Sequence, residues 1–399
     1  MNFVIFSYNY LPQNDPEAFC TARFANALVE AGHNVHVVTM EHQRQIQEDL
    51  EREMTPAVKN ITRVPLKTRE KTYWPRIKYQ TPEWDANNYG SCVRTLKSVL
   101  SKYEKPILVS RMCPAASGIV AWHCRKNAAL WVNHFSDPYP NYLKGGFIGK
   151  IVNRFTYRWT RRMLRDTAFC TITCPDVIRF FQERVMPVSE ERFVLLPHIG
   201  EPMIMPDEQW KSPYPDKKYA AHAGNCYDGR YAGELVRELQ LCKKYGYSIP
   251  FLQAGEMLPK DIKVLRESEI DFKIIKMNSP REASSIFIDA AINLVIDLKI
   301  DYGGYTPFIP SKFVYLLFTD KPIVVFARKD SWMYRLAKEY SDAGIWFADV
   351  NREGALAAAC EEIRNLPEGT IFARKEIRLR FSKKYAVTEF LKKCEMIFQ

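Results

Sequence analysis

The stretch "PSKFVYLLFTDKPIVV", Pro310 to Val325, contains both kinds of element that alternate through the chain. A Pro-Ser start precedes an apolar helical pattern, and the residues after Lys321 form a β-branched run typical of a buried strand. Lys312 falls in the first turn of the predicted helix, where the partial positive charge of the N-terminus disfavours a cation. A bound anion at this point would explain the position of the lysine.

The same alternation extends in both directions from this stretch. A helix is predicted from Glu17 to Ala31, and a second one follows Arg230. Repeated strand-helix alternation predicts parallel sheets with helices on both faces, so the fold class is α/β. The predicted strands are 3–6, 35–38, 107–109, 130–132, 219–221, 251–254, 272–275, 293–296, 323–325 and 345–347.

The length of 399 residues suits two domains. A proline-rich segment from Pro202 to Pro215 separates the two series of strands and gives the best boundary. We therefore predict two doubly wound, Rossmann-like domains, 1–200 and 201–380, that face a central cleft where ligands of such sheets commonly bind.

Composition excludes several classes of protein. The chain is 47% apolar and 26% charged, as in globular proteins. It has no apolar run long enough to span a membrane and no basic leader at Met1, so we expect a cytoplasmic protein. The ten cysteines are scattered, and no HExxH or Asp-x-Asp motif occurs, so we expect no metal and no cofactor.

A phosphate-binding pattern follows the strand that ends near Gly224. A glycine at a strand tip lets a ligand approach the backbone, and Arg230 can donate charge-assisted hydrogen bonds to phosphate. The alternative interpretation is an ordinary tight turn followed by a solvated arginine. For Lys312, the alternative is an ordinary surface lysine. Both cations belong to the second predicted domain, and each is expected just past the C-terminal edge of its sheet, which favours an anion site there.

These motifs, in this order, resemble the donor domain of GT-B glycosyltransferases, and most of all the family 4 retaining enzymes of polysaccharide assembly. The resemblance also includes the first loop and helix up to Gly32-His33-Asn34-Val35, and residues 129–200, so it covers nearly the whole chain. The stretches that carry it in the second domain are Gly224-Asn225 to Arg230, Ser279 to Ala283, Ala290 to Leu294 and Pro310 to Ile323.

The resemblance implies two facing Rossmann-like domains, with the acceptor bound by the first and a UDP- or GDP-linked sugar by the second. It also implies a C-terminal helix at 381–399 that packs back on the first domain, and sugar transfer without a metal. The donor-binding residues would be Gly224, Asn225, Arg230, Ser311, Lys312 and Tyr315. At Tyr315 the family pattern has a carboxylate that binds the ribose, and a tyrosine hydroxyl could accept one hydrogen bond there.

The first domain has candidate catalytic residues at the tip of its strand 130–132. His134 and Asp137 follow this strand, and such groups can orient an acceptor hydroxyl or take its proton. Relatives that resemble this segment carry a sugar-pocket residue here. The alternative is that Asp137 caps the turn before Pro138 and that His134 is a half-buried structural residue.

A basic run without any acid extends from Lys144 to Arg165. The first 200 residues hold 27 Lys and Arg against 18 Asp and Glu, so this half meets an anionic partner. With Phe147, Ile148, Ile151, Phe155 and Trp159 nearby, the run predicts an interfacial helix on an anionic membrane surface. A solvated helix face is the alternative, and no recognised motif supports nucleic acid. The acceptor-binding or membrane-binding candidates are Arg154, Arg158, Arg161, Arg162 and Arg165.

The sequence therefore predicts a glycosyltransferase, of hexosyltransferase type, on the inner face of the membrane. It would move a nucleotide-linked sugar to a lipid-linked or saccharide acceptor in cell-surface polysaccharide biosynthesis. Two other functions remain open. One is a nucleotide-sugar 2-epimerase on the same fold, which needs no acceptor. The other is a non-catalytic nucleotide-sugar-binding protein, which the tyrosine at position 315 makes conceivable.

Overall fold

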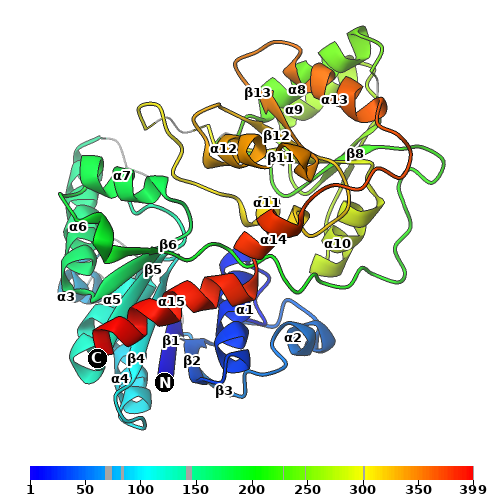
Figure 1. Ribbon diagram of the computed structural model, residues 1–399. Helices are drawn as coiled ribbons and strands as arrows, with labels where there is room; N and C mark the ends of the chain where they lie inside the picture. Colours follow the sequence, from blue (N-terminus) through cyan, green and yellow to red (C-terminus); the bar gives the residue numbers. More distant parts are fainter. Residues whose placement is uncertain are drawn as a thin grey trace. The chain divides into compact units, whose positions relative to one another are not determined.

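The computed structural model describes residues 1–67, 74–81, 85–140, 146–227, 229–247, 249–299 and 302–398. The chain divides into two compact units (Figure 1). Unit 1 comprises Met1–Ile199 and Lys383–Gln399, and unit 2 comprises Gly200–Ser382. The acceptor and donor roles of these units, and the cleft expected between them, stay predictions.

Unit 1 is built on a seven-stranded sheet in the order β3-β2-β1-β4-β5-β6-β7, in which neighbouring strands are parallel. The strands are β1 (Asn2–Ser7), β2 (Asn34–Met40), β3 (Asn60–Val64), β4 (Ile107–Met112), β5 (Leu130–Phe135), β6 (Phe169–Ile172) and β7 (Phe193–Leu195). The helices are α1 (Pro16–Glu30), α2 (Glu48–Met54), α3 (Trp74–Tyr79), α4 (Ala86–Leu100), α5 (Ala116–Cys124), α6 (Gly146–Asp166), α7 (Asp176–Arg184) and α15 (Lys383–Phe398).

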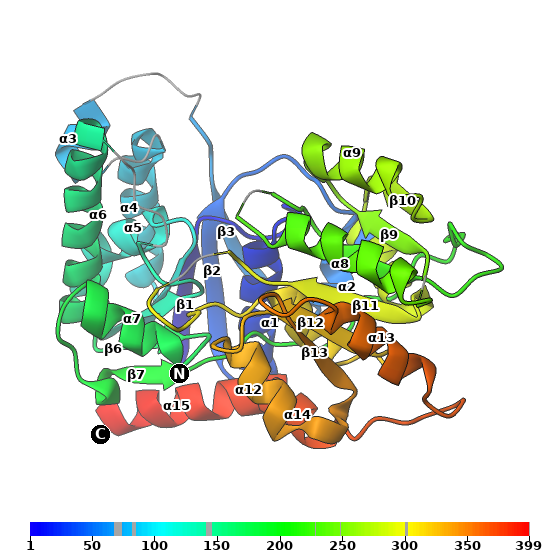
Figure 2. The same ribbon diagram turned by 90° about the horizontal axis from the view of Figure 1, so that it is seen from above.

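Helices cover both faces of the unit 1 sheet. In Figure 2 the strands separate α15 from α4 and α5. Phe390 of α15 packs against Phe3 and Phe24, with ring centroids 5.7 and 5.3 Å apart. The C-terminal helix therefore contributes to the apolar core between the sheet and α1.

Unit 2 contains a six-stranded parallel sheet in the order β10-β9-β8-β11-β12-β13. The strands are β8 (Ala220–Ala223), β9 (Phe251–Ala254), β10 (Phe272–Ile275), β11 (Ile292–Ile296), β12 (Ile323–Ala327) and β13 (Ile345–Asp349). The helices are α8 (Ala232–Lys244), α9 (Pro259–Glu267), α10 (Pro280–Asp289), α11 (Ser311–Leu316), α12 (Trp332–Glu339), α13 (Ala355–Arg364) and α14 (Lys375–Arg380). Single turns of 3-10 helix lie at Arg125–Asn127, Glu190–Arg192 and Ser341–Ala343.

The strand order places a topological switch point in each unit. From β8 the chain builds towards β9 and β10 on one side, and β11 lies on the other side. The corresponding switch in unit 1 lies between β1 and β4. Ligands of doubly wound sheets bind at the carboxyl ends of the strands beside such a point. The loops after β8 and β11 therefore contain the best candidates in unit 2.

Each strand predicted from the sequence is present, but β3, β6 and β7 were not predicted. Strand β3 contains the polar residues Asn60, Thr62 and Arg63, and β6 and β7 have only 4 and 3 residues, too few to display a clear period. Helix α11 is shorter than the apolar pattern after Pro310 indicated. Buried Arg374 donates to the carbonyls of Leu316 and Thr319, which satisfies the chain where α11 ends.

Candidate functional site

Hydrogen bonds to the end of β9 and to the loop that follows it fix the conformation of the loop after β8. Gly224 has φ +135° and donates its N–H to the carbonyl of Ala254 at 2.7 Å. The amide oxygen of Asn225 accepts the N–H of Glu256 at 3.0 Å, so this predicted donor-binding residue also fixes the loop. Because Gly224 lacks a side chain, the backbone at the strand tip can be approached closely.

Lys312 lies directly over this strand tip. A Cβ atom placed on Gly224 would be 2.7 Å from Nζ of Lys312, closer than any van der Waals contact allows. Burial, with a smaller effect of Arg230, lowers the pKa of Lys312 to about 7. No carboxylate forms an ion pair with Lys312 within the part of the chain that the structure describes. The structure thus brings Gly224 and Lys312, two of the predicted donor-binding residues, together.

Two buried residues that sequence reasoning missed support this lysine. His222 of β8 and Gln253 of β9 have no exposed surface. Nε2 of His222 is 2.7 Å from Nζ of Lys312, and Nδ1 of His222 is 2.9 Å from Oε1 of Gln253. A polar pair inside two otherwise apolar strands was the only sequence signal for these residues.

Arg230 lies at the switch point, next to the end of β11. One of its terminal nitrogens donates to the carbonyl of Ile296 at 2.6 Å, and its guanidinium carbon lies 5.2 Å from the ring centroid of Tyr227. Its buried Nε has no hydrogen-bond partner among the described residues. Arg230 can therefore still donate a charge-assisted hydrogen bond to a ligand.

Asp297, another residue that sequence reasoning missed, follows β11 at the same edge of the sheet. Its side chain is 1% exposed, and it accepts the N–H of Leu298 at 2.8 Å. Burial raises the pKa of this carboxyl group to about 7, against the opposing effects of that hydrogen bond and of Arg230. A carboxyl group that titrates near neutral pH at a strand tip is a functional candidate.

The remaining predicted donor-binding residues, Ser311 and Tyr315, both belong to α11. Ser311 is partly exposed at the first position of the helix. The hydroxyl of Tyr315 is buried, accepts the N–H of Ile204 at 2.9 Å and lies 3.1 Å from Oγ of Ser284. The tyrosine therefore ties α11 to the segment that precedes β8 and to α10.

In unit 1, a buried charge cluster occupies the switch point. Nε of Arg111, at the end of β4, donates to Glu17 of α1 at 2.8 Å, and the hydroxyl of Ser136 donates to the same carboxylate at 2.6 Å. Burial raises the pKa of Glu17, while Arg111 and Ser136 act against this shift. Ser136 directly precedes Asp137, so the cluster fixes the loop that carries the predicted catalytic carboxylate.

Asp137 and His134 have different environments. Asp137 is partly exposed, two residues beyond the end of β5. His134 is 1% exposed, its Nδ1 lies 2.9 Å from Oγ1 of Thr171, and burial lowers its pKa well below the usual value. Its Nε2 has no hydrogen-bond partner among the described residues, and His134 is one of the residues that line a cavity of about 10 Å³.

The basic face predicted on α6 is present, but Arg162 is not part of it. The guanidinium carbon of Arg162 lies 4.7 Å from the ring of Trp159 and 5.2 Å from that of Trp122. Arg165 forms an ion pair with Asp166 at 2.8 Å. Five cations of the helix are exposed: Lys150, Arg154, Arg158, Arg161 and Arg165.

The expectation that Trp159 contributes apolar surface was wrong. It is 2% exposed, and its indole N–H donates to the carbonyls of Tyr79 and Gln80, because α3 packs against this side of α6. Helix α3 instead exposes Trp74 and Ile77, at 78% and 64%. The side chains of Phe147 and Ile148, and the whole of Lys144, lie outside the described residues.

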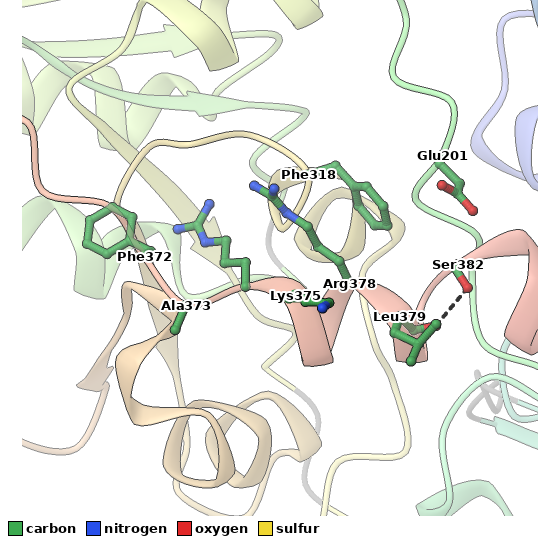
Figure 3. A pocket seen from close by; sticks show the side chains of 9 residues that line it. Glu201, Phe318, Phe372, Ala373, Lys375, Arg378, Leu379 and Ser382 are labelled. Carbon is green, nitrogen blue, oxygen red and sulfur yellow. Dashed lines mark hydrogen bonds between the residues drawn. The ribbon is translucent and has the colours of Figure 1, made fainter.

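One cavity of unit 2 is lined by none of these predicted residues. It has a volume of about 580 Å³, and Figure 3 shows that most of its lining comes from the segment 372–382, which contains α14. Its two arginines, Arg374 and Arg378, donate to main-chain carbonyls of residues 316–321. These cations therefore stabilise the turn after α11.

Neither a metal cluster nor a membrane span is found within the described ranges. No group of three or more His, Cys, Asp or Glu residues there could hold a metal ion. None of the described helices is long and apolar enough to cross a bilayer.

No family model and no curated protein matches this sequence. Solved structures do match along the chain. Sucrose-phosphate synthase from Thermosynechococcus elongatus matches with a TM-score of 0.70 at 15% identity, over 100% of this chain and 99% of that one. HepE from Anabaena, in complex with UDP and glucose, matches with a TM-score of 0.65 at 11% identity, over 100% and 99%. A putative UDP-N-acetylglucosamine 2-epimerase from Listeria monocytogenes matches with a TM-score of 0.60 at 9% identity, over 99% and 96%.

These similarities establish the class of fold. The two parallel-sheet α/β units, of seven and six strands, form the GT-B glycosyltransferase fold. The fold class predicted from the sequence is thereby confirmed.

Proposed function

We propose that this protein is a glycosyltransferase of hexosyltransferase type. It moves a sugar from a UDP- or GDP-linked donor to a lipid-linked or saccharide acceptor in cell-surface polysaccharide biosynthesis. The observation that carries the proposal is the placement of Lys312 and Arg230 around the open strand tip at Gly224, in a GT-B fold. The complex of Anabaena HepE with UDP and glucose supports a uridine donor.

In this proposal, Lys312 and Arg230 bind the diphosphate of the donor. When the bond between the sugar C1 and the diphosphate oxygen breaks, negative charge develops on the leaving group, and the two cations stabilise it electrostatically. Gly224 leaves room for the phosphates, and the hydroxyl of Ser311 can donate a further hydrogen bond. Lys312 and Arg230 thus neutralise the charge of the diphosphate, as a metal ion does in other transferases.

The acceptor side of the proposal rests on unit 1. The acceptor hydroxyl forms the new bond to C1, and Asp137 orients this hydroxyl or takes its proton. His134 supports the same strand tip from its buried position, two residues before Ser136. Retention of the anomeric configuration follows from the resemblance to family 4 enzymes, and nuclear magnetic resonance of the product would test it.

Tyr315 takes a smaller part in the proposed donor site. Its hydroxyl would reach a ribose only by giving up its contacts with Ile204 and Ser284. We therefore assign the ribose no carboxylate partner at position 315. A weaker preference for ribose over deoxyribose nucleotides is the consequence.

We further propose that unit 1 binds an anionic membrane surface on the cytoplasmic side. The exposed cations of α6 supply the attraction, and no exposed acid interrupts them before Asp166. Trp74 and Ile77 on the adjoining α3 supply apolar groups that can enter the interface. A lipid-linked acceptor would be reached from this surface.

The second candidate is a nucleotide-sugar 2-epimerase, which the similarity to the Listeria monocytogenes structure favours. An epimerase converts a sugar nucleotide with no acceptor present, whereas a transferase releases the nucleoside diphosphate and needs an acceptor for product formation. One assay of donor conversion, run with and without acceptor, therefore distinguishes the two activities.

The test begins with a thermal-shift screen of UDP- and GDP-linked sugars, because a ligand that binds only the folded state raises its melting temperature. The best donor is then incubated with and without membrane lipid extracts or oligosaccharides. Acceptor-dependent release of UDP or GDP supports a transferase. Epimerised donor without acceptor supports the epimerase, and binding without conversion or transfer supports a non-catalytic protein.

A further inference from the structure

A chain of hydrogen bonds through the buried side chains of Gln253 and His222 connects the strand tip to Lys312. The side-chain nitrogen of Gln253 donates to the carbonyl of Gly224 at 2.7 Å. Because a carbonyl can only accept, this bond fixes the orientation of the amide and leaves Oε1 to face His222. Oε1 can only accept as well, so Nδ1 of His222, at 2.9 Å, must carry the proton.

The tautomer of His222 follows from this chain. In a neutral imidazole with the proton on Nδ1, Nε2 has a lone pair and accepts a hydrogen bond. Nζ of Lys312, at 2.7 Å, is its donor. Burial, followed by the effect of Lys312, lowers the pKa of His222 well below its usual value, which agrees with a neutral ring.

A neutral acceptor suits a lysine that must bind an anion. A carboxylate in the same place would neutralise the ammonium group and compete with a phosphate for it. The imidazole instead fixes the position of Nζ and leaves its positive charge for the ligand. Within the described part of the chain, His222 is the one hydrogen-bond partner of Nζ.

We propose that His222 is a positioning residue for the donor site, which holds Lys312 over Gly224 and couples binding of the nucleoside diphosphate to uptake of a proton. This inference rests on the proposed function. Within the described residues and without ligand, the ammonium group hydrogen-bonds to the neutral ring of His222. A diphosphate that arrives beside it stabilises the protonated lysine, so the complex binds more protons than the free protein.

Burial, and to a smaller extent Arg230 in the loop after β8, lowers the pKa of Lys312 to about 7. Arg230 is the charged group around the pair that lowers the pKa of Lys312, and a Cys226 thiolate would raise it. The thiol of Cys226 has a pKa of about 11 because of burial, so it is neutral at pH 7. Asp261 of α9 acts on Cys226, and Asp297 after β11 acts on Arg230. Neither carboxylate forms an ion pair with Lys312 in the described residues.

Calorimetry of UDP binding tests the inference, with GDP in its place if the wild type binds GDP more tightly. Titrations at pH 7.5 in buffers of different ionisation heat give the number of protons taken up. We expect a clear fractional uptake for the wild type with UDP and none with uridine. We expect His222→Leu to weaken UDP binding about 10-fold, the loss of roughly one hydrogen bond to a charged group.

His222→Gln provides the rescue, because a glutamine keeps an acceptor near the position of Nε2. It should retain most of the affinity. His36→Leu is the matched control, since His36 is also a buried strand histidine with two hydrogen-bond partners but lies in unit 1. It should leave UDP affinity and proton uptake unchanged. Gln253→Leu frees the tautomer of His222 and should reduce the affinity even if His222→Leu fails to fold.

The outcomes separate the inference from the proposed function. A wild type that binds neither UDP nor GDP contradicts the proposed function itself. Tight UDP binding with no proton uptake, or with the same affinity and uptake in folded His222→Leu, overturns only the role of His222. Equal weakening of UDP and uridine in the variants would mean general damage to the pocket and would likewise overturn it.

Discussion

Gly224 and Lys312 lie so close together that a Cβ added at position 224 would be 2.7 Å from the lysine Nζ, so a larger residue there must displace the lysine side chain. The backbone there has φ +135°, which L residues rarely adopt. We predict that Gly224→Ala displaces Lys312 and weakens UDP binding at least about 10-fold, with about 1–3 kcal/mol lost from folding. Calorimetry and urea unfolding measure both. Gly246→Ala is the control, since Gly246 has φ +77° with open space around it; it should lose stability but not affinity.

The second prediction separates phosphate contacts from nucleoside contacts. Lys312→Ala or Arg230→Ala removes a hydrogen bond to a charged group, about 1.5–3 kcal/mol, which corresponds to roughly 10- to 150-fold weaker binding. The loss should occur with the sugar nucleotide and with UDP but hardly with uridine, which lacks phosphates. Titration of the wild type and both variants with the three ligands measures it. Wild-type affinity in both variants would make Lys312 an ordinary lysine.

The third prediction concerns stability without ligand. The pKa of Lys312 is about 7 in the folded protein and near 10.5 when unfolded. Between about pH 7 and pH 10.5 the unfolded state binds more protons than the folded state does. Lys312 therefore makes the free energy of unfolding rise with pH over this range. Lys312→Met removes the cost of the partly buried charge, which is largest below pH 7. It should stabilise the protein by about 0.5–2 kcal/mol at pH 6 and by less at pH 9.

Urea unfolding at pH 6, 7.5 and 9 checks this pH dependence. Lys211→Met serves as the control, because Lys211 is an exposed lysine of the same unit. A gain from Lys312→Met that does not change with pH would contradict the assigned pKa. The stabilisation by Lys312→Met would then come from packing alone.

The fourth prediction tests the acceptor side. Asp137→Asn keeps the shape of the side chain but removes its charge and basicity. Turnover should fall on the order of 100-fold or more, while donor affinity stays within about 2-fold. Steady-state kinetics and UDP titration separate the two effects. Asp216→Asn, an exposed residue of unit 2, should behave as wild type. If folded Asp137→Asn turns over normally, Asp137 has no catalytic role.

The fifth prediction concerns the membrane surface. The protein should sediment with anionic liposomes at low salt and be released as salt rises, since surface attraction is screened. Replacing Lys150, Arg154 and Arg158 by Glu should abolish sedimentation. The same charge change at the exposed Lys211, Lys218 and Lys244 of unit 2 should not.

The apolar contribution of Trp74 and Ile77 to liposome binding can be measured separately, at high salt. Trp74→Ala with Ile77→Ser should weaken the binding that persists at high salt, because that remainder depends on buried apolar area. Ile371→Ser is the matched control, since Ile371 is 94% exposed but lies in unit 2. A wild type that ignores anionic liposomes while acting on a soluble acceptor would exclude the membrane proposal.

Local pattern was enough to predict the α/β architecture. Runs such as Ile323 to Val325 are long and apolar because strands of parallel sheets are buried on both faces, and this leaves a clear signal. The same reasoning failed for β6 and β7, which are too short to show a period. It also misjudged Trp159, whose burial depends on α3, a helix some 80 residues earlier in the chain.

Sequence by itself also singled out Gly224, Arg230 and Lys312 as candidates, because a glycine at a strand tip and a cation in a first helical turn give a local signal. Only the tertiary structure decided what holds them. His222 and Lys312 are 90 residues apart, and His222 and Gln253 are 31 apart. Buried polar groups need hydrogen-bond partners, and which partners they meet depends on which strands lie side by side. The order of the strands in the sheet cannot be derived from local sequence spacing. For that reason the tautomer of His222, the position of Lys312 and the inward hydroxyl of Tyr315 follow from the assembled sheet alone.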